Sequence, residues 1–147
     1  MKKIYNYLLA FFGGVLGVSL LYIVFAPFCF FPSLVVSTTL WLTLLSAGFL
    51  EEGIKFLLIN RDIGKYPYGY LLGFGFGLFE SIFVHPFWID IFAFRGRTLA
   101  ILMHMGTAFL ICYFVKKKKP IRGLLIAIAI HTLWNVFWVV LFKTDFS

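Results

Sequence analysis

The feature that most constrains this sequence is a pair of adjacent carboxylates, Glu51 and Glu52, inside an otherwise apolar run from Ser33 to Ile59. One charge at the centre of a membrane helix costs roughly 2.5–3.5 kcal/mol, so two unpaired carboxylates would oppose insertion by about 5–7 kcal/mol. On a helix, Lys55 lies one turn after both glutamates and can neutralise one of them. The other carboxylate needs partners on neighbouring helices, which predicts a bundle with a polar interior.

The composition is typical of an integral membrane protein. Hydrophobic residues make up 62% of the 147 positions and charged residues 13%, against about 25% charged in average soluble domains. The length suits a single domain over 1–147. We predict an all-α bundle of about five transmembrane helices, which cover residues 4–26, 33–59, 68–84, 98–115 and 121–142.

The basic residues lie in short gaps between the apolar runs, which favours a role in membrane topology over nucleic-acid binding. With the N-terminus in the cytoplasm, nine of the 13 Lys and Arg residues fall on the cytoplasmic side: Lys2, Lys3, Arg61, Lys65, Lys116–Lys119 and Arg122. The positive-inside rule therefore predicts a multi-pass protein of the cell membrane whose C-terminus lies on the opposite side. No nucleic-acid partner is expected, and the sequence leaves the oligomeric state open.

Glycines at four-residue spacing predict two places where helix backbones approach each other closely. Gly13 and Gly17 form one such pair, and Gly69, Gly73 and Gly77 form a longer stripe. Small residues at this spacing are typical of helix–helix interfaces in membranes.

The ionisable residues of four predicted helices share one depth. Counted at 1.5 Å per residue from the predicted cytoplasmic helix ends, Glu51, Glu80, His104 and His131 lie about 14–18 Å inside a core that is ~30 Å thick. Each residue alone could serve packing or a structural hydrogen bond. Polar pairs in membranes contribute only about 0.6 kcal/mol on average, too little to offset so many costly insertions. The set therefore predicts a shared polar site.

The chemistry that this set suits is hydrolysis. A carboxylate beside a water can act as a general base, and neutral imidazoles can bind a metal or stabilise an oxyanion. A catalytic zinc takes three protein ligands and keeps an open position, which His104, His131 and one of the three glutamates could supply. Asn135 follows His131 by one helical turn and could support the site. The HExxH signature is absent from the sequence, which excludes a soluble-type zincin.

At these positions the sequence resembles the PrsW-type intramembrane proteases. Residues 51–55 (EEGIK) are similar to their EExxK motif, and residues 76–80 (FGLFE) to their FxxxE motif. His104 and the segment 131–135 (HTLWN) are similar to the two later histidine motifs, the last of which reads HxxxN. The related CAAX-prenyl and bacteriocin-processing proteases have EExxxR and FxxxH, where this chain carries Phe56 and Glu80.

The resemblance implies cleavage of a peptide bond in or beside the bilayer, in a membrane protein or peptide substrate. It implies that Glu51 activates water and that Glu52 pairs with Lys55 or assists. Glu80, His104 and His131 would hold a zinc or another divalent metal, or the oxyanion, with Asn135 in support. The implied site is thus Glu51, Glu52, Glu80, His104, His131 and Asn135, with Lys55 as the charge partner.

Two other functions remain compatible with the sequence. A proton- or ion-coupled carrier also uses intramembrane Glu and His residues, although a relay needs them at different depths. A non-catalytic membrane scaffold of the same family would keep the glycine stripes and bind a partner through them.

Overall fold

The computed structural model describes residues 2–29, 48–59, 66–84 and 91–142, and within these ranges the chain forms helices and no strand. The helices are α1 (Lys2–Cys29), the helical residues 48–59, α3 (Tyr66–Phe79), α4 (Ile91–Lys116) and α5 (Pro120–Phe142). A π-helical turn, Glu80–Val84, continues α3. The all-α prediction is confirmed for the described residues. Residues 33–47 of the second predicted helix lie outside them.

Local sequence explains where several helices begin and end. Proline stands in the first turn of α3 (Pro67) and at the first position of α5 (Pro120), where its missing N–H costs nothing. Lys118 has a φ of 56°, the left-handed conformation that commonly ends a helix. The predicted start of α4 at Thr98 is wrong, because the helix begins at Ile91 and already includes Arg97.

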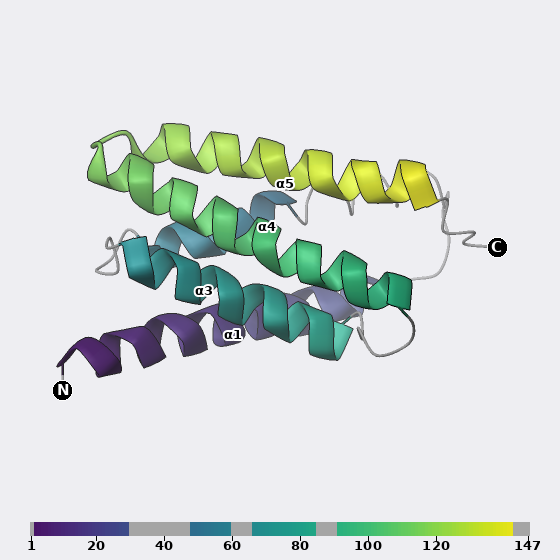
Figure 1. Ribbon diagram of the computed structural model, residues 1–147, viewed down its shortest axis with the longest axis horizontal. Helices are drawn as coiled ribbons and strands as arrows, with labels where there is room; N and C mark the ends of the chain where they lie inside the picture. Colours follow the sequence, from purple (N-terminus) through teal and green to yellow (C-terminus); the bar gives the residue numbers. More distant parts are fainter. Residues whose placement is uncertain (1, 30–47, 60–65, 85–90, 143–147) are drawn as a thin grey trace.

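Helices α1, α3, α4 and α5 follow one another across the molecule, and each packs against the next (Figure 1). The helix formed by residues 48–59 contacts members of this row through several side chains. Lys55 contacts His104 of α4, and a methyl group placed on Gly17 of α1 would lie 2.9 Å from Ile54. This short helix, which carries both adjacent glutamates, therefore packs against α1 and α4, and it exposes Phe49 and Leu57 on its outer side.

The predicted glycine stripe of α3 lies against α4. A Cβ atom on Gly73 would collide with the backbone carbonyl of His104, and one on Gly77 would lie 2.8 Å from Cα of Ile101. The prediction for α1 is partly wrong: Gly17 is packed, but Gly13 has nothing within 4 Å. Its neighbour Gly14 contacts α3 instead. Glycine thus brings α3 close enough to α4 for short polar contacts to form between them.

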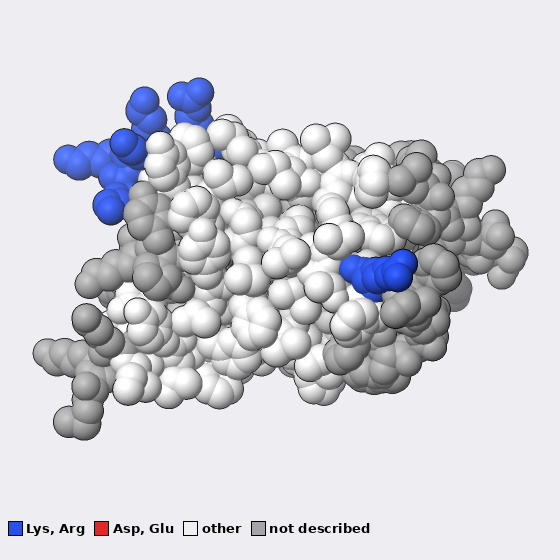
Figure 2. Space-filling model, viewed as in Figure 1, with Lys and Arg blue, Asp and Glu red and all other residues white. Residues whose placement is uncertain are grey.

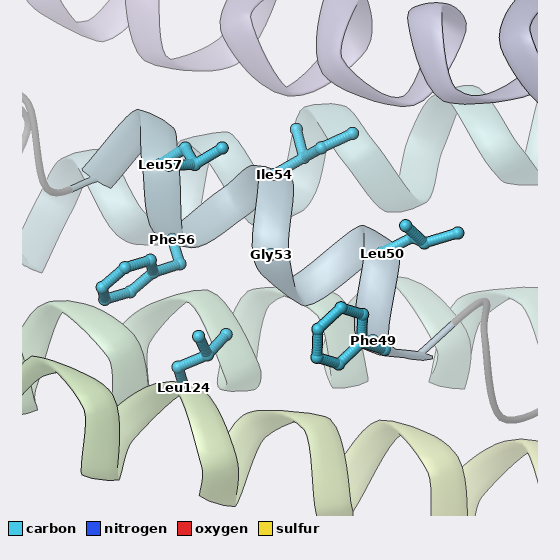
Figure 3. A pocket seen from close by; sticks show the side chains of 7 residues that line it. All are labelled: Phe49, Leu50, Gly53, Ile54, Phe56, Leu57 and Leu124. Atoms are coloured by element: carbon cyan, nitrogen blue, oxygen red, sulfur yellow. The ribbon is translucent and has the colours of Figure 1, made fainter.

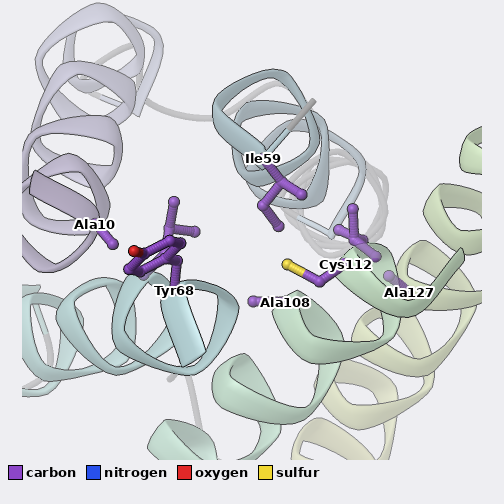
Figure 4. Close-up of a cluster of buried hydrophobic side chains, with 8 residues drawn as sticks. Ala10, Ile59, Tyr68, Ala108, Cys112 and Ala127 are labelled. Carbon is purple, nitrogen blue, oxygen red and sulfur yellow. The ribbon is translucent and has the colours of Figure 1, made fainter. Parts of the chain in front are cut away.

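The buried apolar residues pack between the helices, and half of the main cluster consists of alanine or cysteine (Figure 4). The main cluster consists of Ala10, Ile59, Tyr68, Leu72, Ala108, Ile111, Cys112 and Ala127. The outer surface of α1, in contrast to this buried cluster, exposes large apolar side chains. These are Leu8, Phe12, Leu16, Leu20 and Ile23, each more than half exposed. Helices packed through small residues, with bulky residues outside, are typical of membrane bundles.

Two helical stretches of the described chain, Phe94–Lys116 and Pro120–Trp138, are long and apolar enough to cross a membrane. A shorter apolar stretch, Ile4–Leu20, lies in α1. On the face shown in Figure 2, basic side chains gather at one end of the molecule, further basic atoms lie toward the other end, and uncharged residues cover the surface between them. The exposed basic residues of the α4–α5 turn are Lys116–Lys119 and Arg122.

Candidate functional site

The polar side chains of three helical segments meet around one oxygen atom, Oε1 of Glu52. It accepts hydrogen bonds from Nζ of Lys55 at 2.6 Å, from Nδ1 of His131 at 2.7 Å and from Oγ1 of Thr107 at 3.1 Å. Glu52 is fully buried. A buried carboxylate needs this degree of compensation because burial removes its hydration. The predicted pairing of Glu52 with Lys55 is confirmed.

Lys55 links this carboxylate to the first histidine. Its Nζ lies 2.8 Å from Nδ1 of His104 and 3.3 Å from Oγ1 of Thr107, in addition to the contact with Glu52. The ammonium also lies 4.7 Å from the centre of the Phe76 ring, within the range of a cation–π interaction. Lys55 is fully buried, so its charge is balanced entirely inside the protein.

The other nitrogen of His104 contacts Glu80. The distance from Nε2 to Oε2 of Glu80 is 2.7 Å, and Oε1 of the same carboxylate accepts from Arg97 at 3.5 Å. The Arg97 side chain is 31% exposed, so this chain of contacts leads from the buried cluster toward the surface. Glu80 was expected in the site, whereas the role of Arg97 was not.

The geometry of Glu80 depends on an irregular turn that sequence analysis did not predict. Helix α3 stops being α-helical at Phe79, and the π-helical turn begins at Glu80. Isolated π-helical turns are frequent at functional sites because they redirect the side chains that follow them. Within this turn Ser81 Oγ donates to the carbonyl oxygen of Gly77 at 2.7 Å.

Glu51 faces both histidines without a hydrogen bond to either. Its Oε2 lies 3.7 Å from Nε2 of His131 and 4.0 Å from Nδ1 of His104. This oxygen is buried and has no hydrogen-bond partner. The two imidazole rings are close, with centres 5.1 Å apart and planes at 83°. Among the described residues, Oε2 of Glu52 likewise has no hydrogen-bond partner. The adjacent glutamates differ in that Oε1 of Glu52 accepts three hydrogen bonds, whereas Oε2 of Glu51 faces two imidazoles.

A metal ion could be held by Glu51, His104 and His131, whose ligand atoms all lie within 4.8 Å of one another. Of the three glutamates that could complete the ligand set, Glu51 belongs to this group, and the set with Glu80 that the resemblance implies stays a prediction. Glu80 contacts Nε2 of His104, whereas Oε2 of Glu51 faces Nδ1 of His104 and Nε2 of His131. Carboxylate and imidazole donors are the types that zinc prefers.

Two further outcomes concern single residues. Asn135 is half-buried one turn after His131, and no hydrogen bond joins it to another residue of the described ranges. Thr107 was missed by sequence analysis, although it touches both Glu52 and Lys55. Its position one turn after His104 on the same helix face was the signal that could have identified it.

An apolar hollow lies on the outer side of helical residues 48–59 (Figure 3). The residues that line it are Phe49, Leu50, Gly53, Ile54, Phe56, Leu57 and Leu124. None of these side chains can transfer a proton or bind a cation. The polar cluster lies on the opposite side of the same helix, so the chemistry belongs to that cluster.

Comparison of the chain with known protein families, with curated proteins and with solved structures found no match. The resemblance to PrsW-type proteases therefore stays a prediction that rests on the motifs. The geometry of the buried cluster is the basis for a functional proposal.

Proposed function

We propose that this chain is a membrane-embedded hydrolase that cleaves a peptide bond of a membrane-associated protein or peptide. The observation that carries the proposal is the bare Oε2 of Glu51, buried and 3.7 Å from Nε2 of His131. A carboxylate held this way is suited to act as a general base toward a water molecule.

The hydrogen bonds of the cluster define the state of His131. Its Nδ1 lies 2.7 Å from Oε1 of Glu52, and because a carboxylate only accepts, Nδ1 carries the proton. Nε2 then has a free lone pair and faces the acceptor oxygen of Glu51. Two acceptors 3.7 Å apart can be bridged by one water that donates a hydrogen to each of them. The water would be oriented by two fixed groups before any substrate enters.

The proposed reaction uses this water as the nucleophile. Glu51 takes one proton from the water, and the water oxygen attacks the carbonyl carbon of the scissile peptide bond. The tetrahedral intermediate then collapses, the C–N bond breaks, and the leaving nitrogen receives the proton that Glu51 held. Asn135, one turn after His131, is proposed to donate to the developing oxyanion.

A divalent metal fits the donor types of Glu51, His104 and His131 but competes with Lys55. The Lys55 ammonium already lies 2.8 Å from Nδ1 of His104, the atom that would have to bind the ion. If bound, such an ion would lower the pKa of a coordinated water. The proposed steps use only the side chains of this chain.

The bilayer is the proposed environment, with all five predicted helices crossing it and the N-terminus in the cytoplasm. Two apolar helical stretches long enough to span, and the large apolar side chains outside α1, support this. In water, an exposed apolar surface of this kind would favour aggregation. A site inside a bundle would meet its substrate from the plane of the membrane.

The proposal is tested with purified protein reconstituted in liposomes and a panel of fluorogenic peptides that partition into the bilayer. Wild type is compared with Glu51→Gln and with a control, Ser19→Ala, whose hydroxyl bonds only its own helix. We expect cleavage by wild type and the control, and loss of about 10²-fold or more in Glu51→Gln, the contribution typical of a general base. Equal cleavage by all three proteins would contradict the proposal.

The same liposomes separate the alternative functions. A proton- or ion-coupled carrier would change the internal pH or ion content without cleaving any peptide. A scaffold would bind peptides without cleaving them.

A further inference from the structure

We propose that the Lys55 ammonium is the resident cation of the buried cluster. It fixes His104 in the tautomer that carries its proton on Nε2, and it occupies the Nδ1 lone pair that a metal ion would need. Lys55 is thus a positioning residue that acts through His104. The inference concerns the ligand chemistry of the cluster and does not depend on whether the chain cleaves peptides.

The first step is a count of the donors on Lys55. An ammonium has three N–H donors and no acceptor. Three acceptors surround it: Oε1 of Glu52 at 2.6 Å, Nδ1 of His104 at 2.8 Å and Oγ1 of Thr107 at 3.3 Å. The Phe76 ring lies beside the same nitrogen. All three protons of Lys55 are therefore in use, and its position is fixed by contacts with α3, with α4 and with Glu52 of its own helix.

The second step follows for His104. Since the ammonium can only donate, Nδ1 must be the acceptor, and the ring proton of the neutral imidazole lies on Nε2. That proton is donated to Oε2 of Glu80 at 2.7 Å. Both nitrogens of His104 are occupied, one by a cation and the other by a carboxylate.

The third step concerns metal binding. A metal ligand must offer a lone pair, and a catalytic zinc site normally has three protein ligands. Because Lys55 occupies the lone pair of His104, the candidate group of Glu51, His104 and His131 retains two ligands that do not bind the ammonium, Glu51 and His131. A divalent ion would also be repelled by the ammonium beside it. Removing the Lys55 charge should therefore convert the cluster into a metal site.

The first test needs no substitution at Lys55. Protein labelled with ¹⁵N-histidine is studied by NMR in lipid nanodiscs, and the His104 signals are assigned by their loss in His104→Gln. We expect the proton of His104 on Nε2, with Nδ1 hydrogen-bonded as an acceptor. A proton on Nδ1 would overturn the proposal.

The second test measures Co²⁺ binding by its visible absorption spectrum. The variant Lys55→Met combined with Glu52→Gln removes both charges of the pair, so neither partner is left behind as an unpaired charge and the net charge of the cluster is unchanged. The matched control is Lys117→Met, which removes an exposed lysine. We expect the double variant to bind Co²⁺ at least ~10-fold more tightly than wild type and the control.

Adding His131→Ala to the double variant should abolish the gain in Co²⁺ affinity, because it removes one of the three ligands. Equal Co²⁺ affinity of the double variant and wild type would overturn the proposal. If the double variant does not fold, the tautomer of His104 in the wild-type protein decides the question.

Discussion

At the scale of single residues, the two adjacent glutamates lie in the same turn of one helix but have different proposed roles, Glu52 in structure and Glu51 in catalysis. Glu52 accepts three hydrogen bonds at one oxygen, whereas Oε2 of Glu51 accepts none. Spacing alone allows Lys55 to pair with either glutamate, and the donors that α4 and α5 supply, Thr107 and His131, lie on the Glu52 side. Glu51 is rotated toward the gap between the two imidazoles.

Glu52→Gln is expected to destabilise the protein strongly. The amide keeps the shape of the side chain but leaves Lys55 as an uncompensated buried charge, and breaking a buried ion pair in this way costs about 3–5 kcal/mol. The measurement is unfolding by denaturant in detergent micelles. Thr98→Val is the control, since its exposed hydroxyl bonds only the carbonyl oxygen of Phe94. A similar unfolding midpoint for both variants would contradict this account of Glu52.

Thr107→Val should also destabilise the protein, but less. It removes one donor to Glu52 and one acceptor of Lys55 while filling the same space, and an unmet buried hydrogen bond costs about 1–3 kcal/mol. Thr107→Ser keeps the hydroxyl and should recover most of the loss. The measurement is the unfolding midpoint of wild type and of both variants. Equal destabilisation by Thr107→Ser and Thr107→Val would contradict this prediction.

At the scale of helices, glycine determines how closely α3 approaches α4 and hence whether the cluster can form. The two backbones are close at Gly73 and Gly77, and this approach allows His104 of α4 to contact Glu80, which follows α3. The π-helical turn then places Glu80 beside His104.

Gly73→Ala should destabilise the bundle by roughly 1–3 kcal/mol, the usual cost of overpacking. The added methyl group would collide with the backbone of α4, which cannot move aside as a side chain can. Gly53→Ala and Gly106→Ala are the controls, because nothing lies within 4 Å of either new methyl group. They should leave stability unchanged or raise it by up to about 1 kcal/mol, the difference in helix propensity. The reverse order would contradict the packing described for these helices.

The sequence predicted those features that depend on helical spacing. Helical spacing predicted that Lys55 would pair with one of the two glutamates, and the resemblance implied Glu52. Glycines at four-residue spacing predicted that another helix would approach residues 69–77 closely. The sequence did not predict the π-helical turn or the early start of α4, because both depend on tertiary packing that overrides local propensity. Periodicity gives the depth of a side chain but not which side of His104 it meets, so spacing left three glutamates open as the third metal ligand.

At the scale of the whole molecule, the face shown in Figure 2 has basic side chains gathered at one end, further basic atoms toward the other end, and uncharged residues between them. The exposed basic turn between α4 and α5 adjoins both stretches that are long enough to span a membrane. Its five positive charges would have to cross the bilayer if the orientation were inverted, which the positive-inside rule opposes.

The proposed orientation predicts that this turn lies in the cytoplasm. Lys118→Cys, in a background with Cys29 and Cys112 replaced by alanine, should react with a membrane-impermeant maleimide in inside-out vesicles and not in intact cells. Lys118 is exposed at the turn, so burial in the protein does not protect it. Labelling of intact cells would contradict the orientation.

The central claim is that Glu51 and His131 direct a water molecule onto a peptide bond. The most direct measurement is mass spectrometry of the products formed in H₂¹⁸O by liposomes that contain wild-type protein or Glu51→Gln. The account predicts two product peptides, one with a single ¹⁸O in its new carboxylate, formed by wild type and reduced about 10²-fold or more in the variant. Intact peptide with both proteins, or labelled products formed equally fast by both, would contradict it.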